Sequence, residues 1–270
     1  MKNTSYALIG LLLLTMMMTS SITSVKGTTY NCTGVVGADA TWKVKTVDEG
    51  ALYGIFGSGW QTVIEDSFGA GAHVEGAKMK SVVTFVNSSW SYDLIVGPGL
   101  VDICLILANV WYWTTEPFGA IPNATNAQTW VFMHPEDITA YCNFFGVNVS
   151  YAAVPYFLSA FPVPVETFLD ELVWDADYTI SGTTVTHNVV APYFGAFGIY
   201  IEDCTESWRY SSKYGTFLGY KLVHNNGTVA YESALVTPSA EEIPGFELFV
   251  LIGVSISTII CVIYILMKKR

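Results

Sequence analysis

The last part of the chain constrains this protein most strongly. An apolar run extends from Leu248 to Met267 and is followed at once by Lys268-Lys269-Arg270. A helix of about 20 apolar residues crosses the roughly 30 Å hydrocarbon core of a bilayer and satisfies its own backbone hydrogen bonds there. Clustered cations favour the cytoplasmic side. The sequence therefore predicts one C-terminal span, with the preceding residues held outside a cell membrane.

The N-terminus agrees with this topology. Lys2 precedes an apolar stretch from Ala7 to Met18, and small polar residues follow. This layout is typical of a secretory signal peptide; an uncleaved signal anchor is the alternative. The predicted organisation is a signal peptide, an extracellular domain, a short linker, a transmembrane helix and a cytoplasmic basic tail, at residues 1–27, 28–236, 237–245, 246–267 and 268–270.

The tail resembles a known class of sorting signal. The triplet Pro244-Gly245-Phe246, one hydrophobic helix and a terminal basic cluster are similar to the PGF-type C-terminal signals of archaeal surface proteins. The resemblance covers the tail alone. It implies an archaeal origin and, in many members, removal of the tail by an archaeosortase and attachment of a lipid at the new C-terminus. Because only a short linker precedes the triplet, a retained single-pass helix is the alternative.

The net charge of the chain limits the kinds of partner that its domain can bind. The chain has a formal net charge of −11. Between residues 28 and 243 it carries only seven cations: Lys43, Lys45, Lys78, Lys80, Arg209, Lys213 and Lys221. Such an acidic domain repels phosphate backbones, so we expect no nucleic-acid partner. An acidic cell-surface coat is the simple interpretation.

The cysteines predict disulfides. Cys261 falls in the predicted span, whereas four cysteines lie in the domain: Cys32, Cys104, Cys142 and Cys204. An even number in an oxidising compartment indicates two disulfides, and three pairings are open. We favour Cys104 with Cys142, and Cys32 with Cys204. Metal ligation is a weaker interpretation because no CxxC spacing occurs.

Glycosylation sequons are scattered along the domain. They begin at Asn31, Asn87, Asn123, Asn148 and Asn226. Five such acceptors are typical of a glycosylated surface protein. The last one falls in Asn225-Asn226-Gly227, a hairpin-turn signal that would present a glycan to solvent.

Periodicity predicts an α+β fold. Alternating strand patterns dominate both ends of the domain, and Lys78–Val86 with Trp90–Val96 form a hairpin pattern around Asn87-Ser88-Ser89. Short helices are expected at 60–68, 135–145 and 165–174, the last two opened by a proline. We predict a mainly antiparallel sheet with a helical and loop insertion over 98–173. A curved sheet or half-barrel is the specific expectation, and a two-sheet sandwich is the alternative.

Catalytic signatures are missing from the sequence. It has no HExxH, no GxSxG and no phosphate-binding or dinucleotide fingerprint. The four histidines, at 73, 134, 187 and 224, are far apart and lack ligand spacing. We therefore predict no catalytic residues, no cofactor and a non-enzymatic protein.

Two residue groups are candidate binding sites. Asp170, Glu171, Asp175 and Asp177 form the densest carboxylate group and supply oxygen ligands for Ca²⁺, although a solvated acidic face is the default. Aromatic rings concentrate in the middle of the domain, and strand alternation in Trp111-Tyr112-Trp113 would place both tryptophans on one face. With Trp130 they are candidates to line a pocket for a lipid-like ligand; rings that simply build the core are the alternative.

Three functions remain open at this level. The first is a membrane-anchored, glycosylated surface protein whose domain binds an apolar ligand or a neighbouring protein. The second is a structural coat or adhesion component. The third is a surface hydrolase with a dispersed site, which would need a cleft holding a histidine beside a carboxylate or a serine.

Overall fold

The computed structural model describes residues 29–34, 36–96, 99–119, 126–148, 160–195 and 198–236. The predicted signal peptide, linker, transmembrane helix, basic tail and Asn123 lie outside these residues. Within them, no helix is both long and apolar enough to cross a membrane.

One antiparallel sheet of nine strands forms the body of the protein. Its order is β4-β3-β2-β1-β11-β10-β9-β6-β5. In chain order the strands are β1 (Asp39–Val47), β2 (Lys78–Val96), β3 (Gly99–Thr114), β4 (Asn126–Met133), β5 (Tyr178–Ser181), β6 (Thr184–Val189), β9 (Cys204–Tyr210), β10 (Phe217–His224) and β11 (Val229–Leu235). A separate two-stranded sheet joins β7 (Tyr193–Gly195) to β8 (Gly198–Tyr200). The antiparallel sheet confirms the α+β expectation in its main feature.

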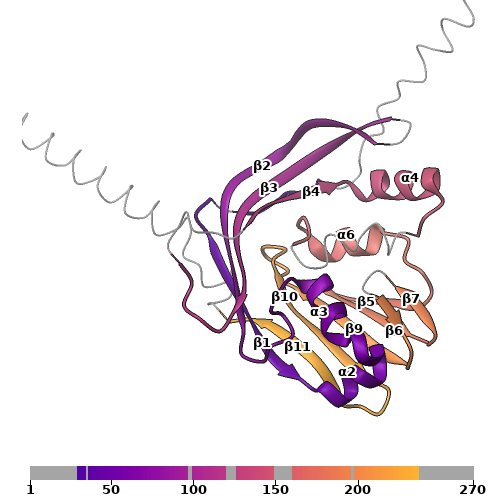
Figure 1. The fold of residues 1–270 in the computed structure, drawn as a ribbon. Helices are drawn as coiled ribbons and strands as arrows, with labels where there is room; N and C mark the ends of the chain where they lie inside the picture. The colour runs from indigo at the N-terminus through magenta and orange to yellow at the C-terminus, as the bar shows by residue number, and fades with distance from the viewer. Residues whose placement is uncertain are drawn as a thin grey trace, which may run out of the picture.

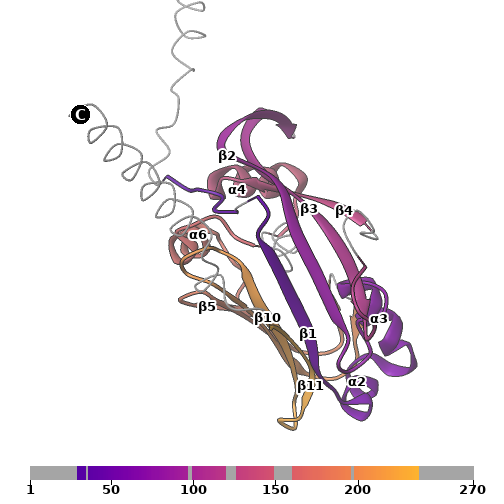
Figure 2. The ribbon, with the colours of Figure 1, turned by 90° about the vertical axis from the view of Figure 1, so that its left-hand side faces the viewer.

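The sheet is strongly bent. Figure 1 shows β2, β3 and β4 arching away from the strands around β9, β10 and β11, while β1 lies at the turn of the bend. In Figure 2 the strands β1, β2 and β3 run side by side along the length of the molecule. Because the order is unbroken from β4 to β5, the nine strands are not divided into the two sheets of a sandwich.

The helices cover one face of this sheet, which we call the inner face. They are α2 (Glu49–Phe56), α3 (Trp60–Phe68), α4 (Pro135–Phe145) and α6 (Val165–Glu171), with a short 3₁₀ turn, η1, at Gly57–Gly59. All four helices place side chains in one core cluster with the inward residues of the strands; examples are Leu52, Ile138, Phe168 and Trp42. The opposite face is only partly open to solvent, because strand register and alternation place the buried Thr41, Val82 and Trp111 there.

Local chemistry explains where the helices begin. The Asp48 carboxylate accepts a hydrogen bond from the Ala51 amide at 2.9 Å and caps α2. Pro135 occupies the first turn of α4 with two carboxylates, which favour the positive end of a helix. Gly146 ends α4 in a left-handed conformation. The observed bounds of α3 and α4 match the sequence prediction.

Two sequence predictions of strand arrangement are wrong. The segment around Asn87-Ser88-Ser89 is not a turn, since β2 is one strand with a register shift between Asn87 and Tyr92. A tight hairpin turn favours glycine at a positive φ angle, and this tripeptide has none. The insertion is also smaller than predicted, because the apolar run from Val101 to Trp113 lies within β3, in the sheet.

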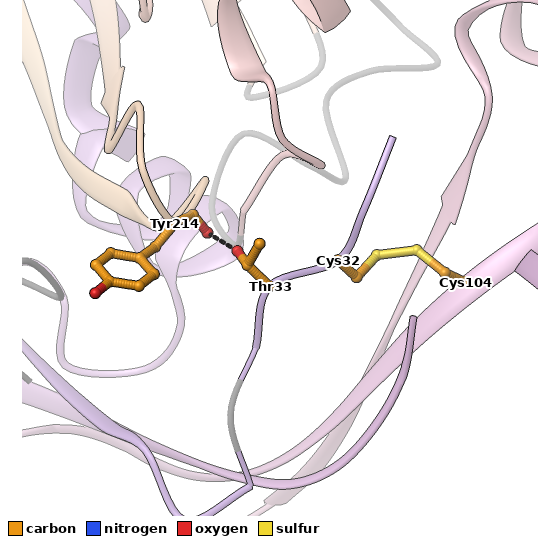
Figure 3. Close-up of a disulfide and its surroundings, with 4 residues drawn as sticks. All are labelled: Cys32, Thr33, Cys104 and Tyr214. Atoms are coloured by element: carbon orange, nitrogen blue, oxygen red, sulfur yellow. Dashed lines mark hydrogen bonds between the residues drawn. A yellow bond between two sulfur atoms is a disulfide. The ribbon is translucent and has the colours of Figure 1, made fainter. Parts of the chain in front are cut away.

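The disulfide pairing also differs from the prediction. Cys32 is bonded to Cys104, with 6.6 Å between their Cα atoms, and Cys142 and Cys204 are free and buried. Figure 3 shows the bond joining the N-terminal segment to β3, beside the hydrogen bond from the Thr33 hydroxyl to the Tyr214 carbonyl. The prediction failed because Cys104 was assigned to an insertion, whereas it lies in the sheet where the N-terminal segment passes.

Candidate functional site

An open hollow lies where β3 ends. It has a volume of about 560 Å³ and is lined by Ala70, Gly71, Trp111, Tyr112, Trp113, Thr114, Pro117, Phe118 and Gly119. Aromatic and small apolar residues dominate this lining, and Tyr112 is its one titratable side chain. Ligand pockets in proteins have this size and this apolar character, with a few polar groups that orient the ligand.

A β-bulge shapes the hollow. Lys78 pairs with Thr114, but Lys80 pairs with Trp111, so β3 carries one extra residue at this point. A bulge of this kind breaks the alternation of side chains. As a result Trp113 belongs to the main core cluster and Trp111 does not. The expectation that alternation places both tryptophans on one face is therefore wrong, although both line the hollow.

The two tryptophans differ in their hydrogen bonding. The Trp113 indole N–H donates to the Phe68 carbonyl at 2.7 Å. Trp111 is only 4% exposed, and its indole nitrogen is buried with no hydrogen-bond partner among the described residues. A buried unsatisfied donor costs about 1–3 kcal/mol, and such groups in a native structure call for an explanation. Trp111 lines the hollow but its indole nitrogen is buried, so an acceptor atom on a ligand would satisfy the N–H after a small shift of the ring.

Glycines allow the facing turn to approach β3 closely. Gly71 has a φ of +82°, and a Cβ there would lie 2.6 Å from the Trp113 carbonyl oxygen. The Gly71 amide donates to the Glu65 carboxylate at 2.8 Å, and the same oxygen lies 2.9 Å from His73. The bond from Gly71 is the main reason that the pKa of Glu65 lies below its usual value, and His73 adds to it against the effect of burial. These contacts fix one wall of the hollow.

Trp130 does not belong to this site. It lies on β4 opposite Ile106 of β3, is half-buried, and packs against the core. Of the three tryptophans predicted to bind a ligand, the structure thus places Trp111 and Trp113 at the hollow and Trp130 in the packing of the sheet.

A second cluster, buried and polar, lies on the inner face of the other half of the sheet. Tyr178, His187 and Glu206 are direct cross-strand neighbours on β5, β6 and β9. The His187 ring is stacked on Tyr178, with centroids 4.2 Å apart and planes 5° apart. His187 and Glu206 are 2% and 1% exposed. Strand alternation thus brings a charged pair into the core.

The hydrogen bonds of this cluster are complete. His187 Nδ1 lies 3.0 Å from Glu206 Oε2, and its Nε2 lies 3.0 Å from Asp177 Oδ2. The hydroxyls of Tyr200 and Tyr220 donate to Glu206 Oε1 at 2.9 and 2.6 Å. We call these five residues the polar network. Because ionised carboxylates accept but do not donate, the imidazolium form of His187, with a hydrogen on each nitrogen, satisfies both contacts.

Titration within the polar network follows from burial and charge. Burial by itself lowers the pKa of His187, but the hydrogen bonds and charges of Glu206 and Asp177 outweigh it, and the pKa is raised. Burial first, and then the Glu206 carboxylate, raise the pKa values of Tyr200 and Tyr220 well above normal. The two carboxylates therefore favour the protonated form of His187.

This arrangement stabilises the fold rather than forming a catalytic triad. A general base needs a free nitrogen lone pair to take a proton from a nucleophile, and both nitrogens of His187 face carboxylates. The network residues are also absent from the lining of the hollow. His224 pairs with Glu202 at the surface, and His134 packs edge-on against Tyr30.

The predicted calcium group is not assembled. Asp170 and Glu171 are exposed at the end of α6, and Asp177 is engaged by His187. Over the described ranges, no group of three or more His, Cys, Asp or Glu side chains is arranged to hold a metal ion. Residues close in sequence diverge here because α6 ends at Glu171, and Asp177 then enters β5.

Three of the predicted sequons are open to solvent. Asn31, Asn148 and Asn226 are exposed, whereas Asn87 is half-buried within β2. The Asn226 side chain accepts a hydrogen bond from the Thr228 amide at 2.9 Å in the turn between β10 and β11. A glycan at this turn would extend away from the sheet.

Comparison with protein-family models, with curated proteins and with solved structures finds no match to this chain. The interpretation of the site therefore rests on its own geometry.

Sequence reasoning missed the polar network, although a signal was present. In β6, His187 alternates with Val185 and Val189, and in β9, Glu206 alternates with Trp208 and Tyr210. A titratable residue in phase with the apolar residues of a strand is expected to be buried, and a buried charge needs a partner. Two such strands indicate that the charges pair.

Proposed function

We propose that this chain is a membrane-anchored, glycosylated surface protein whose extracellular domain binds a small uncharged ligand without chemical change. The ligand would have an apolar or aromatic body and a hydrogen-bond acceptor such as a carbonyl or ether oxygen. The one observation that carries this proposal is the buried Trp111 N–H, which lacks a partner among the described residues and lies in the wall of an aromatic hollow.

The lining supports this class of ligand. Rings from Trp111, Tyr112, Trp113 and Phe118 offer faces for stacking and apolar contact. The lining residues carry no charge at neutral pH, so a charged ligand would lose its hydration without a counter-ion. A neutral ligand loses less and gains the Trp111 hydrogen bond.

The membrane anchor and the glycans belong to the same proposal and rest on the sequence. The apolar run before the terminal cations supports a C-terminal span, or a lipid attached after processing at the Pro244-Gly245-Phe246 signal. The exposed asparagines 31, 148 and 226 support glycosylation. Intact mass spectrometry of the protein extracted from its own membrane would detect the processed tail, the glycans and any co-purified ligand.

The binding site is tested with Nile red, an uncharged dye with an aromatic body and a carbonyl acceptor. We expect the full chain in detergent, corrected against empty micelles, to bind the dye saturably. Trp111→Phe keeps a ring but removes the N–H, and should weaken binding about two- to tenfold, since a buried hydrogen bond contributes roughly 0.5–1.5 kcal/mol. The matched control is Trp130→Phe, the same change outside the hollow, which should leave the dissociation constant unchanged. Equal binding by all three proteins would refute the site.

A further inference from the structure

The cations of this acidic domain are gathered on one surface. All seven between residues 28 and 243 lie in the described part of the chain, and six of them are on strands of the large sheet. Lys43 on β1 lies directly opposite Lys78 on β2, and Thr41 lies opposite Lys80. Direct cross-strand partners point to the same side of a sheet, as do alternate residues of one strand. Lys43, Lys78 and Lys80 therefore share one face.

The same face continues across the neighbouring strands. Lys221 on β10 lies opposite Ser207 on β9, two residues from Arg209. In β9 the buried residues are Cys204, Glu206, Trp208 and Tyr210, so Ser207 and Arg209 point away from the core. Trp42 and Val44 are likewise buried on β1, whereas Lys43 between them is partly open. We call the side opposite the helices the outer face.

The outer face is mainly cationic and polar, although Thr41, Val82 and Trp111 are buried beside Lys80 on the same face. It carries Lys43, Lys78, Lys80, Lys221 and Arg209, and Lys45 is exposed at the bulge between Val44 and Thr46. In sheet order, the strands from β2 through β1, β11, β10, β9 and β6 to β5 carry two carboxylates on the outer face among their described side chains, Asp39 and Glu232. Asp39 is paired with Lys80 at 3.0 Å, and Glu232 lies opposite Lys221. The charge that remains is positive.

Apart from Asp39, the exposed carboxylates of the described residues lie elsewhere. They are on the helices that cover the inner face, on the adjoining loops and just after β3: Asp48, Glu49, Asp66, Glu75, Glu116, Glu136, Glu166, Asp170, Glu171, Glu202 and Asp203. We call this the acidic side. Each molecule therefore has a positive surface and a negative surface that are complementary to each other, despite a net charge of −11.

We propose that the outer face of the nine-stranded sheet docks onto the acidic side of a second copy of this chain. Complementary potentials select and orient a partner, and the acidic side carries most of the exposed carboxylates among the described residues. The two surfaces are different, so the contact is heterologous and continues from copy to copy instead of closing as a symmetric dimer. The result is a lateral array.

The proposal does not depend on the ligand hollow. It needs only that many copies lie at high local concentration, which confinement to a membrane would provide. Since exposed charges dominate both surfaces, we expect the contact to be weak in dilute solution and to weaken further as salt screens it.

Carbodiimide cross-linking of the full chain in liposomes tests this contact. The reagent joins a lysine to a carboxylate in direct contact, and an equal mixture of ¹⁴N- and ¹⁵N-labelled protein identifies cross-links between copies. We expect inter-copy cross-links from Lys43, Lys78 or Lys80 to carboxylates of α2, α3 or α6. Their yield should fall at least fivefold at about 0.5 M NaCl, where the Debye length is only a few ångströms.

Charge reversal supplies the matched control. Lys78→Glu places a carboxylate in the outer face and should reduce the inter-copy yield about tenfold. Lys213→Glu makes the same change in charge at the one domain cation outside the sheet, and should leave the yield unchanged. Reversing the carboxylate that cross-links to Lys78 should restore the contact in the Lys78→Glu background. Circular dichroism confirms that each variant is folded.

Other results would overturn the proposal. Inter-copy cross-links that are absent, or that form equally through Lys213, would show that the outer face does not select a second copy. The outer face could instead bind anionic lipid vesicles in a salt-sensitive way, without inter-copy cross-links. If Lys78→Glu abolished that binding, the outer face would be assigned to a membrane surface.

Discussion

Two clusters of aromatic residues in this protein have opposite polar chemistry. In the polar network, four described donors reach carboxylate oxygens: two tyrosine hydroxyls and both nitrogens of His187. In the hollow, the rings surround open space and the Trp111 N–H has no partner among the described residues. A satisfied buried network makes the core specific and rigid, whereas an unsatisfied donor beside a cavity marks a place for another molecule. Aromatic density alone does not distinguish these cases.

We expect the largest effect on stability from a substitution that breaks the polar network. Glu206→Ala removes the acceptor of three hydrogen bonds and leaves the buried His187 with Asp177 as its remaining carboxylate partner. We expect the free energy of unfolding to fall by about 3–5 kcal/mol, measured by urea denaturation of the full chain. Glu202→Ala is the control, because it removes a carboxylate from a histidine pair at the surface and should cost under about 1 kcal/mol. Equal costs would mean that the network adds nothing beyond surface pairing.

Removal of the disulfide tests whether the strands beside the hollow and the strands of the polar network are stabilised separately. Replacing both Cys32 and Cys104 by serine should cost about 2–4 kcal/mol. Because the bond joins the N-terminal segment to β3, hydrogen exchange should rise in β2, β3 and β4 more than in β6 and β9. Non-reducing peptide mapping should recover this bond, with free thiols at Cys142 and Cys204. A uniform rise in exchange would argue against separate stabilisation.

The two tryptophans at the hollow allow an indole N–H with a hydrogen-bond partner to be compared with one that has no described partner. Trp113→Phe loses the hydrogen bond to the Phe68 carbonyl, whereas Trp111→Phe removes a donor that has no described partner. We expect Trp113→Phe to cost about 1 kcal/mol more in unfolding free energy than Trp111→Phe. The two changes are identical in volume, so thermal denaturation of the two ligand-free variants isolates the hydrogen bond. The reverse order would show that the Trp111 N–H is satisfied in solution.

The smallest expected effect is a dependence on pH. The pKa of His187 is raised in the folded protein, so its stabilising contribution is complete below about pH 6.5, the unfolded value, and is lost as the pH rises through the folded value. We expect unfolding free energy to decline above about pH 6.5, by at most roughly 1.4 kcal/mol per pH unit from this group. His187→Gln should flatten that part of the profile; an unchanged slope would assign it to other groups.

Several parts of the structure could be predicted from local sequence. The bounds of α4 were predicted because a proline, two carboxylates in the first turn and a terminal glycine act within one or two turns of a helix, and α3 lies between Gly59 and Gly69. The turn at Asn226 was predicted for the same reason. The full length of β2 was not predicted, because its pairing with β3 depends on an entire neighbouring strand. The aromatic site was predicted in part: Trp111 and Trp113 line the hollow, but the bulge that separates them is a property of strand register.

The sequence by itself determined the antiparallel α+β class, the helices α3 and α4 and the acidic character of the chain, because each follows from residues that are near neighbours or from composition. It missed α2 and extended α6 by three residues. Only the tertiary structure decided that Cys32 pairs with Cys104, that His187 lies between Glu206 and Asp177, and that the scattered lysines share one face. Each of these depends on which strands are adjacent and in which register. Strand pairing joins residues far apart in the chain, and a shift of one residue would exchange the inner and outer faces.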